Sequence, residues 1–342
     1  MVDPEAPGLS PAQVISHYSG DQWEEFVDEL VEGIQSTHGY LLVKRMGGPG
    51  DLGIDVAGFK SAHGLEGPWD CYQCKQYASP LQPSDAWPEI LKIFRATVAG
   101  DCVMPDAYLF VAPKGAGLKL NKMLSQPTKA KEEFIGWLAT HAPAPAMNAV
   151  ERIAVDALVA ATNFGMFDAL QGRHVISMHA DTRYYSLRFN SPLPERREIE
   201  AVPGAYTGDE KRYVDQLVAA YRERHPADDL DRDNVASHPT RGQHFKRQRQ
   251  AFFRAESLRV YARESTPDGT FEALQADVHA GVVELAESDH ADGYTRAQAV
   301  LQASASIDLN NHRLIERADL DDRKGVCHQL VNDERLTWVE AP

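Results

Sequence analysis

Three residues with the chemistry of a hydrolytic metal site lie close together in the sequence. Asp55 lies in the apolar run Gly-Ile-Asp-Val, and Gln73 and Lys75 lie two residues apart in Tyr-Gln-Cys-Lys. Side chains on a strand alternate between its two faces, so Gln73 and Lys75 are expected to share a face, with Ile54 and Val56 opposite Asp55 in a core. Pairing of these strands would bring a carboxylate, an amide oxygen and an ammonium group together.

This set of groups suits metal-assisted attack of water on a phosphodiester. Carboxylate and carbonyl oxygens are ligands for a hard ion such as Mg²⁺, which activates water and neutralises charge developing on the phosphate. We therefore expect Asp55 and Gln73 to bind Mg²⁺, with Mn²⁺ as an alternative, and the backbone carbonyl of Cys74 to be a further ligand. Lys75 is expected to position or deprotonate the water and to contact the phosphate.

A helix upstream offers another carboxylate. Its apolar residues recur at helical spacing: Trp23, Phe26, Val27, Leu30, Val31 and Ile34. Asp21 is the predicted N-cap, with Glu24 three residues later as in a capping box. Glu24 lies at the edge of the apolar stripe and Glu25 lies on the solvent side, so Glu24 is predicted to stand near or on the metal. A role for Glu24 in capping alone is an equal alternative.

Length and composition indicate a globular protein. The 342 residues correspond to about two domains, and 43% hydrophobic with 25% charged residues is ordinary for such proteins. No apolar run is long enough for a membrane helix, and the first residues lack the features of a signal peptide. The four cysteines suggest no disulfide framework, so we expect a reducing, cytoplasmic location.

The net charge of −15 argues against a protein that coats DNA without sequence preference. Such binding needs clustered Lys and Arg to neutralise phosphates. A nuclease with a local basic track, or one that reaches DNA through assembly with a partner, stays compatible with this charge. Acidity that simply favours solubility is an equal alternative.

The elements up to residue 190 alternate between strands and helices. This alternation predicts an α/β domain over residues 14–190, with a mixed sheet flanked by helices, after a loose N-terminus at residues 1–13. The expected strands cover residues 40–45, 69–77, 106–113 and 174–179, and the expected helices cover 21–39, 84–99, 134–138 and 153–170.

A proline- and glycine-containing segment at residues 191–205 is predicted to be a linker. Beyond it, residues 206–342 are predicted to form an all-helical domain for partner binding or oligomerisation. The segment 241–254 is the most basic in the chain, with Arg241, Lys246, Arg247, Arg249 and Arg254 and no acid. It is either a DNA contact or an amphipathic helix with a phenylalanine core face.

Three other patterns could suggest chemistry, and we expect none of them to provide it. Cys71 and Cys74 are three apart on a strand and face opposite sides, which disfavours a shared zinc ion. His174 and His179 likewise face opposite ways and are read as structural or surface groups. Cys327 and its sequence neighbour His328 point apart on a helix and are read as packing and capping residues.

The N-terminal motifs together resemble the Mrr-like branch of the PD-(D/E)xK nuclease superfamily. They are Trp23-Glu24-Glu25-Phe26 on a helix, a glycine-rich loop ending in Gly53-Ile54-Asp55, and Gln73-Cys74-Lys75. Glutamine in place of glutamate departs from the superfamily consensus and fits this branch. The resemblance implies a restriction-endonuclease-like fold and Mg²⁺-dependent hydrolysis of double-stranded DNA by Asp55, Gln73, Lys75 and Glu24.

The C-terminal half resembles the C-terminal region of effector subunits in bacterial ABC-three-component, or Lamassu-type, anti-phage systems. The resemblance rests on FFRAESLRVYARE, FEALQADVHAGV and KGVCHQLVNDERLTWV, within residues 206–340. It implies docking on an SMC-like ABC ATPase with a small accessory subunit, and release as an active homo-oligomer, a dimer or tetramer. Two alternatives are a stand-alone Mrr-like restriction enzyme for modified DNA and a catalytically inactive adaptor with a nuclease fold.

Overall fold

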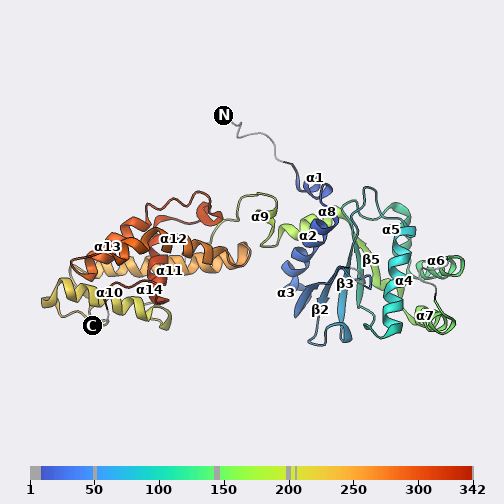
Figure 1. Ribbon diagram of the computed structural model, residues 1–342, viewed down its shortest axis with the longest axis horizontal. Helices are drawn as coiled ribbons and strands as arrows, with labels where there is room; N and C mark the ends of the chain where they lie inside the picture. Colours follow the sequence, from blue (N-terminus) through green and yellow to red (C-terminus); the bar gives the residue numbers. More distant parts are fainter. Residues whose placement is uncertain (1–8, 49–51, 142–146, 198–201, 205, 341–342) are drawn as a thin grey trace. The chain divides into compact units, whose positions relative to one another are not determined.

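The computed structural model describes residues 9–48, 52–141, 147–197, 202–204 and 206–340. The chain divides into two compact units, Met1–Asn190 and Ser191–Pro342 (Figure 1). Residues 1–8 of the predicted loose N-terminus lie outside the described residues. The rest of that segment includes the start of a helix, because Ser10 caps Pro11–Ser16 through a capping box with Gln13.

A five-stranded mixed sheet forms the centre of the first unit. Its strands follow one another in the order of the sequence. The first two pairs, β1–β2 and β2–β3, are antiparallel, whereas β3–β4 and β4–β5 are parallel. The strands are β1 Leu42–Arg45, β2 Val56–Phe59, β3 Trp69–Cys74, β4 Ala107–Val111 and β5 Phe167–Leu170. The mixed α/β class predicted from the sequence is confirmed.

Helices cover both faces of this sheet (Figure 1). Alternate β3 side chains enter two different cores: Trp69 and Cys71 pack beside residues of α4 to α7, and Tyr72 and Cys74 pack beside α2 and α8. The helices of this unit are α1 Pro11–Ser16, α2 Gly20–Gly33, α3 Gln35–His38, α4 Pro83–Ala99, α5 Leu118–Leu124, α6 Pro127–Thr140, α7 Ala149–Ala161, α8 Gly172–Ala180 and α9 Tyr185–Arg188. Short 3₁₀ turns span Gly64–Glu66 and Phe164–Met166.

Helix α4 forms the parallel crossover from β3 to β4. Pro83 stands at its first position, where the missing N–H costs no hydrogen bond. Gly100 ends the helix in the left-handed conformation, with φ 84°. Between them an apolar face that includes Ile90 and Phe94 is fully buried against the sheet. Helix α4 is therefore held in a fixed position against the sheet.

Two sequence-based expectations in the first unit are wrong. Residues 174–179 lie in helix α8 instead of a strand: Val175 and His179, four residues apart, are buried on one helical face. Residues 167–170, expected to be helical, form strand β5. Both segments are short, and for short apolar runs periodicity alone does not separate strand from helix.

The start of α2 also differs from expectation. Ser19 is the N-cap, and its capping-box partner is Gln22. Gln22 Oε1 accepts a hydrogen bond from Ser19 N at 2.9 Å, and Ser19 Oγ accepts one from Gln22 N at 3.2 Å. Asp21 and Glu24 therefore have no capping role, and the capping alternative for Glu24 is wrong.

The described part of the second unit contains helices and no strand. They enclose one core, in which Tyr213, Phe252 and Trp338 are almost fully buried. The helices are α10 Lys211–Arg224, α11 Gly242–Ser265, α12 Thr270–Glu287, α13 Gly293–Ser304 and α14 Leu320–Asn332. Short 3₁₀ turns span Gly208–Glu210, Pro226–Asp228, Val235–Ser237 and Arg313–Glu316.

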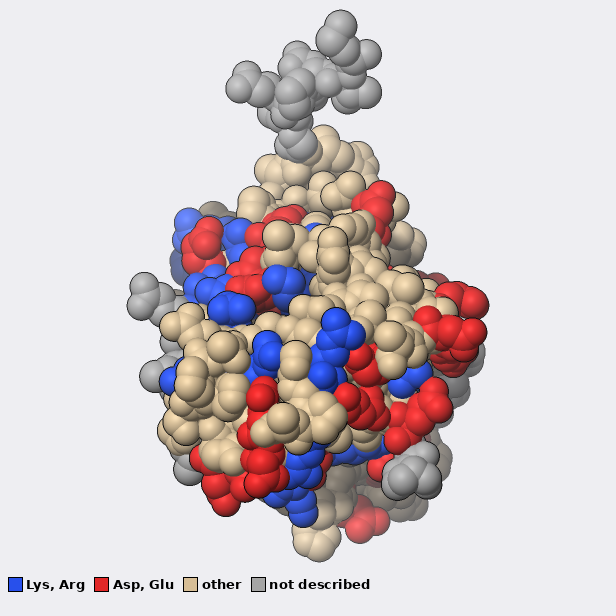
Figure 2. Space-filling model, turned by 90° about the vertical axis from the view of Figure 1, so that its left-hand side faces the viewer, with Lys and Arg blue, Asp and Glu red and all other residues tan. Residues whose placement is uncertain are grey.

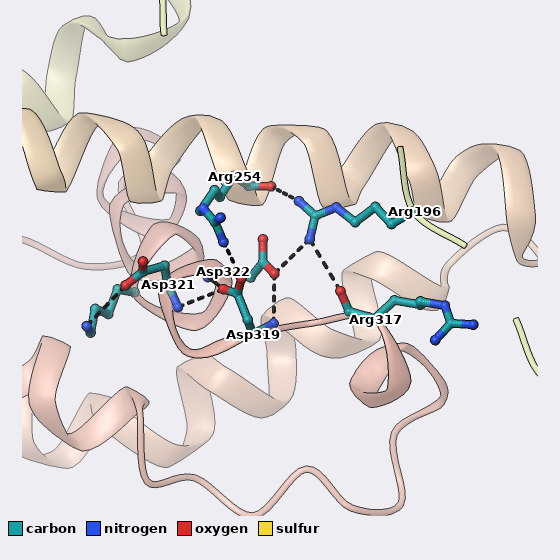
Figure 3. Close-up of polar contacts among 7 residues, drawn as sticks. Arg196, Arg254, Arg317, Asp319, Asp321 and Asp322 are labelled. Carbon is teal, nitrogen blue, oxygen red and sulfur yellow. Dashed lines mark hydrogen bonds and ion pairs between the residues drawn. The ribbon is translucent and has the colours of Figure 1, made fainter. Parts of the chain in front are cut away.

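The first part of the predicted linker is packed into this helical unit. Leu193 is only 2% exposed within its core, and Tyr261 donates a hydrogen bond to the Pro194 carbonyl at 2.6 Å. Arg196 reaches between α11 and α14 (Figure 3), where it donates to Asp322 Oδ2 at 2.7 Å and to the Arg254 carbonyl at 2.5 Å. Residues 191–197 therefore belong to the second unit.

Candidate active site at the end of strand β3

The structure brings Asp55 and Gln73 into direct contact. The register of β2 and β3 pairs Val56 with Tyr72, which sets the residue before β2 beside the end of β3. Asp55 Oδ2 accepts hydrogen bonds from Gln73 Nε2 and from the backbone N–H of Cys74, both at 2.6 Å. Asp55 is 4% and Gln73 is 1% exposed. The carboxylate is therefore buried and fixed by two donors.

Asp55 itself stands at a bend just before β2, not inside the strand. Ile54 and Val56, predicted to share one core, enter different ones: Ile54 packs in the core beside α4, and Val56 in the core beside α2. The bend interrupts the alternation on which that prediction depended. The contact with Gln73 follows from the β2–β3 register, which places residue 55 opposite residue 73.

Tyr108 of β4 determines which way the Gln73 amide faces. Its hydroxyl lies 2.9 Å from the Gly53 carbonyl and 3.1 Å from Gln73 Oε1. Gln73 therefore presents its nitrogen to Asp55 and its oxygen to Tyr108. Ligation of a metal ion beside Asp55 through the Gln73 oxygen requires the amide to turn over, after which the Tyr108 hydroxyl can accept a hydrogen bond from Nε2.

Lys75 lies one residue beyond the end of β3. Its backbone N–H donates to the Val111 carbonyl at 2.9 Å, which extends the β3–β4 pairing, and its side chain is 15% exposed. Its Nζ lies 3.0 Å from Glu89 Oε1 on α4, and Glu89 Oε2 lies 2.9 Å from Lys92 Nζ. The sequence-based reasoning missed Glu89. The signal that could have identified Glu89 is an acid on the buried apolar stripe of α4, next to Ile90.

Glu24 is held by Arg45 of β1. Arg45 Nη2 lies 2.9 Å from Glu24 Oε2, and the Glu24 side chain is 24% exposed. Gly47 allows this placement, because a Cβ at that position would lie 2.7 Å from Glu24 Oε2. Glu25, the other acid considered, is more exposed and lies 3.3 Å from Arg188. Of the two acids of α2 that were considered, Glu24 is thus the one that lies beside Gly47.

The Cys74 thiol is a small buried group, as expected. Burial raises its pKa well above the usual value, and the nearby carboxylates of Asp55 and then Glu24 raise it further. Both Cys71 and Cys74 are buried, and they enter different cores.

Within the described residues, no three His, Cys, Asp or Glu side chains gather as a metal-binding group. A divalent ion at this site would therefore need amide or backbone oxygens besides carboxylates. Asp55, Gln73 and the Cys74 carbonyl are oxygen donors of the kind that Mg²⁺ prefers. The donor chemistry fits a hard divalent ion, provided that the Gln73 amide turns.

Most of the basic segment 241–254 is neutralised within the second unit. Arg249 forms a two-pronged buried contact with Glu210, both distances being 2.7 Å. Arg254 is paired with Asp319. Phe245 and Phe252 are buried in the core, so the amphipathic-helix reading is confirmed. On the face drawn in Figure 2, basic and acidic side chains are interspersed instead of forming one basic patch.

Cys327 and His328 are both fully buried in the second unit. His328 Nε2 donates to Gln248 Oε1 at 3.1 Å, and burial lowers the pKa of His328 to about 3. Their role in packing agrees with the expectation from the sequence. His179 is likewise buried, where it contacts Glu29 Oε2 at 3.2 Å.

Comparison with known proteins gives a match in the second unit. Residues 210–338 match C-terminal domain 6 of the ABC-three component (ABC-3C) systems, and this range contains α10 to α14 in full. No curated protein and no solved structure matches the chain. Among the described helices, none has the length and apolar character needed to cross a membrane. The second unit thus links this chain to the ABC-three component systems and to partnership with their other subunits.

Proposed function

We propose that this chain is a metal-dependent DNA endonuclease that acts as the effector subunit of an ABC-three component anti-phage system. The observation that carries the proposal is the buried contact of Asp55 with Gln73 and the Cys74 N–H, with Lys75 one residue further on. The match of residues 210–338 supports the defence role over a stand-alone restriction enzyme.

Mg²⁺, or Mn²⁺ in its place, would be held by Asp55, the Cys74 carbonyl and the oxygen of a turned Gln73 amide. When bound, the ion would supply activation of water and neutralisation of charge on the phosphate. Glu24 faces the glycine-rich turn and is the further acid near the ion. The Cys74 N–H orients Asp55 before any ion arrives, whereas the hydrogen bond from Gln73 Nε2 is given up when the amide turns.

Lys75 contacts the scissile phosphate in this proposal. Its ammonium group is a compact charge with three donors, suited to a phosphate oxygen and to the attacking water. Hydrolysis adds the water oxygen to phosphorus and breaks one P–O ester bond, and a proton released by the water goes to the leaving alkoxide, which becomes a free hydroxyl group. The low exposure of Asp55 and Gln73 keeps the surroundings poor in water, which strengthens electrostatic interactions there.

The described residues hold one Asp–Gln–Lys set, whereas a double-strand break requires two scissile phosphates to be attacked. The proposal therefore includes a homodimer or tetramer as the DNA-cutting form. A chain of net charge −15 also approaches DNA poorly by itself. Retention as a single copy by an SMC-like ATPase and a small accessory subunit, followed by release and self-association on double-stranded DNA, accounts for both features.

Cleavage of supercoiled plasmid DNA tests the proposal. The wild-type chain should nick or linearise the plasmid with Mg²⁺ or Mn²⁺ and lose this activity with a chelator. Lys75→Met and Asp55→Asn should lower the rate by orders of magnitude, because metal and charge terms supply several kcal/mol.

A matched control is Lys60→Met. Lys60 also forms an ion pair beside the sheet, 2.7 Å from Asp70, but it follows β2 at the end opposite the candidate site. This variant should cut normally. Unchanged cutting by a folded Lys75→Met protein would refute the assignment.

A further inference from the structure

Helix α4 places an acid where its neighbours are apolar. Glu89 is 8% exposed, and Ile90 and Ile93 beside it are fully buried. Burying a carboxylate is costly unless an opposite charge compensates for it. Lys75 Nζ at 3.0 Å and Lys92 Nζ at 2.9 Å provide that compensation. The Glu89 carboxylate therefore depends on its lysine partners. If position 89 served packing alone, an apolar residue would be more favourable there.

The backbone around Gly53 joins Glu89 to the rest of the candidate site. Gly53 has φ +76°, and a Cβ there would lie 3.1 Å from Lys92 Cβ and 3.5 Å from the Glu89 carbonyl. The Gly53 carbonyl accepts the Tyr108 hydroxyl that also contacts Gln73. One continuous set of contacts thus connects α4 with the strand ends that carry Gln73 and Lys75.

We propose that Glu89 is a positioning residue that holds the Lys75 ammonium group in place for the phosphate. The inference rests on the proposed nuclease function, because it assigns Glu89 a task through Lys75. Lysine has a flexible four-carbon stem, and an ion pair in a poorly hydrated site restricts it to one position. Two lysines share one carboxylate, so the three side chains keep a net positive charge that attracts a phosphate.

This arrangement predicts that substitution of Glu89 lowers both kcat and KM. Glu89→Gln removes the anchor, so kcat should fall about 10- to 100-fold, the usual effect of losing a supporting contact. It also removes a negative charge from the DNA site, so KM should fall. Glu89→Asp keeps the charge and should restore part of kcat. A purely structural role for Glu89 gives no reason for KM to fall.

A second readout does not depend on cleavage. Acetylation of individual lysines, followed by mass spectrometry on the metal-free full chain, reports how readily each side chain leaves its ion pair, because only an accessible, deprotonated amine reacts. In Glu89→Gln, Lys75 should be acetylated faster than in the wild type. Lys131, whose Nζ donates to the Thr162 carbonyl at 2.9 Å, is the internal control for an intact first unit and should not change.

Double substitution separates this inference from the proposed function. With Lys75→Met already present, Glu89→Gln should cause no further loss of activity. If Lys75→Met cuts normally, the nuclease assignment itself fails. If Lys75→Met is inactive while Glu89→Gln cuts like the wild type and leaves Lys75 acetylation unchanged, only the role of Glu89 is overturned. Should Glu89→Gln not fold, Glu89→Asp and the acetylation rates decide.

Discussion

Acid should destabilise the second unit through two histidines, of which His328 is buried and His244 half-buried. His244 and His328 lie on either side of Gln248, whose amide nitrogen is 3.3 Å from His244 Nε2 and whose oxygen is 3.1 Å from His328 Nε2. The Gln248 amide donates to His244, so His244 Nε2 must be unprotonated. His328 Nδ1 is buried without a hydrogen-bond partner among the described residues. A second proton on either ring would therefore find no hydrogen-bond acceptor among these contacts.

The magnitude follows from the pKa values. Burial lowers the pKa of His328 from 6.5 to about 3, and burial with nearby arginines lowers that of His244 to about 4. Below pH 6.5 the two histidines therefore bind protons in the unfolded chain and stay unprotonated in the folded chain. The free energy of unfolding consequently decreases as the pH falls. Between pH 7.5 and pH 5, each histidine should cost about 2 kcal/mol of unfolding free energy.

Urea unfolding of the full chain at these two pH values, followed by circular dichroism, measures the effect. His328→Gln keeps a donor for Gln248 and cannot titrate, so the loss of stability in acid should shrink by about 2 kcal/mol. The exposed His174 on α8 provides the control, since His174→Gln should leave the pH dependence unchanged. Equal acid sensitivity of the wild type and His328→Gln would refute the reasoning.

Two further predictions follow from contacts described above. Tyr108→Phe should weaken binding of Mn²⁺, measured by calorimetry, about 10- to 100-fold, because the turned Gln73 amide loses its acceptor; unchanged affinity would exclude ligation by Gln73. A fragment starting at Ser191 should be more stable to urea than one starting at Tyr206 by about 3 to 5 kcal/mol, because the shorter fragment leaves Asp322 buried without Arg196. Equal urea midpoints of the two fragments would contradict the assignment of residues 191–197 to the helical unit.

The meeting of Asp55 and Gln73 could be predicted because both belong to segments that form adjacent strands. Their residue types and the strand character of each segment are local properties. The helical second unit was predictable for a similar reason, since its apolar residues repeat over long segments. Helix α11 spans Gly242–Ser265 and contains most of the segment 241–254, for which an amphipathic helix was one of the two alternatives.

The details that decide chemistry depend on residues far away in the sequence. The orientation of the Gln73 amide depends on Tyr108, 35 residues away, and Lys75 is held by Glu89 from the following helix. No local pattern specifies either contact. The predicted N-cap of α2 was wrong for another reason. Ser19 and Asp21 are both good capping residues, and only the capping box with Gln22 identifies Ser19 as the N-cap.

The placement of Cys74 has a consequence for resistance to oxidants. Its backbone N–H supports Asp55, whereas its thiol lies in the core beside α2 with a raised pKa. Oxidants and alkylating agents attack the thiolate, which this burial suppresses. All four cysteines of the chain are buried. A candidate site that uses the backbone of a cysteine is thus shielded from the electrophiles that inactivate enzymes with exposed thiols.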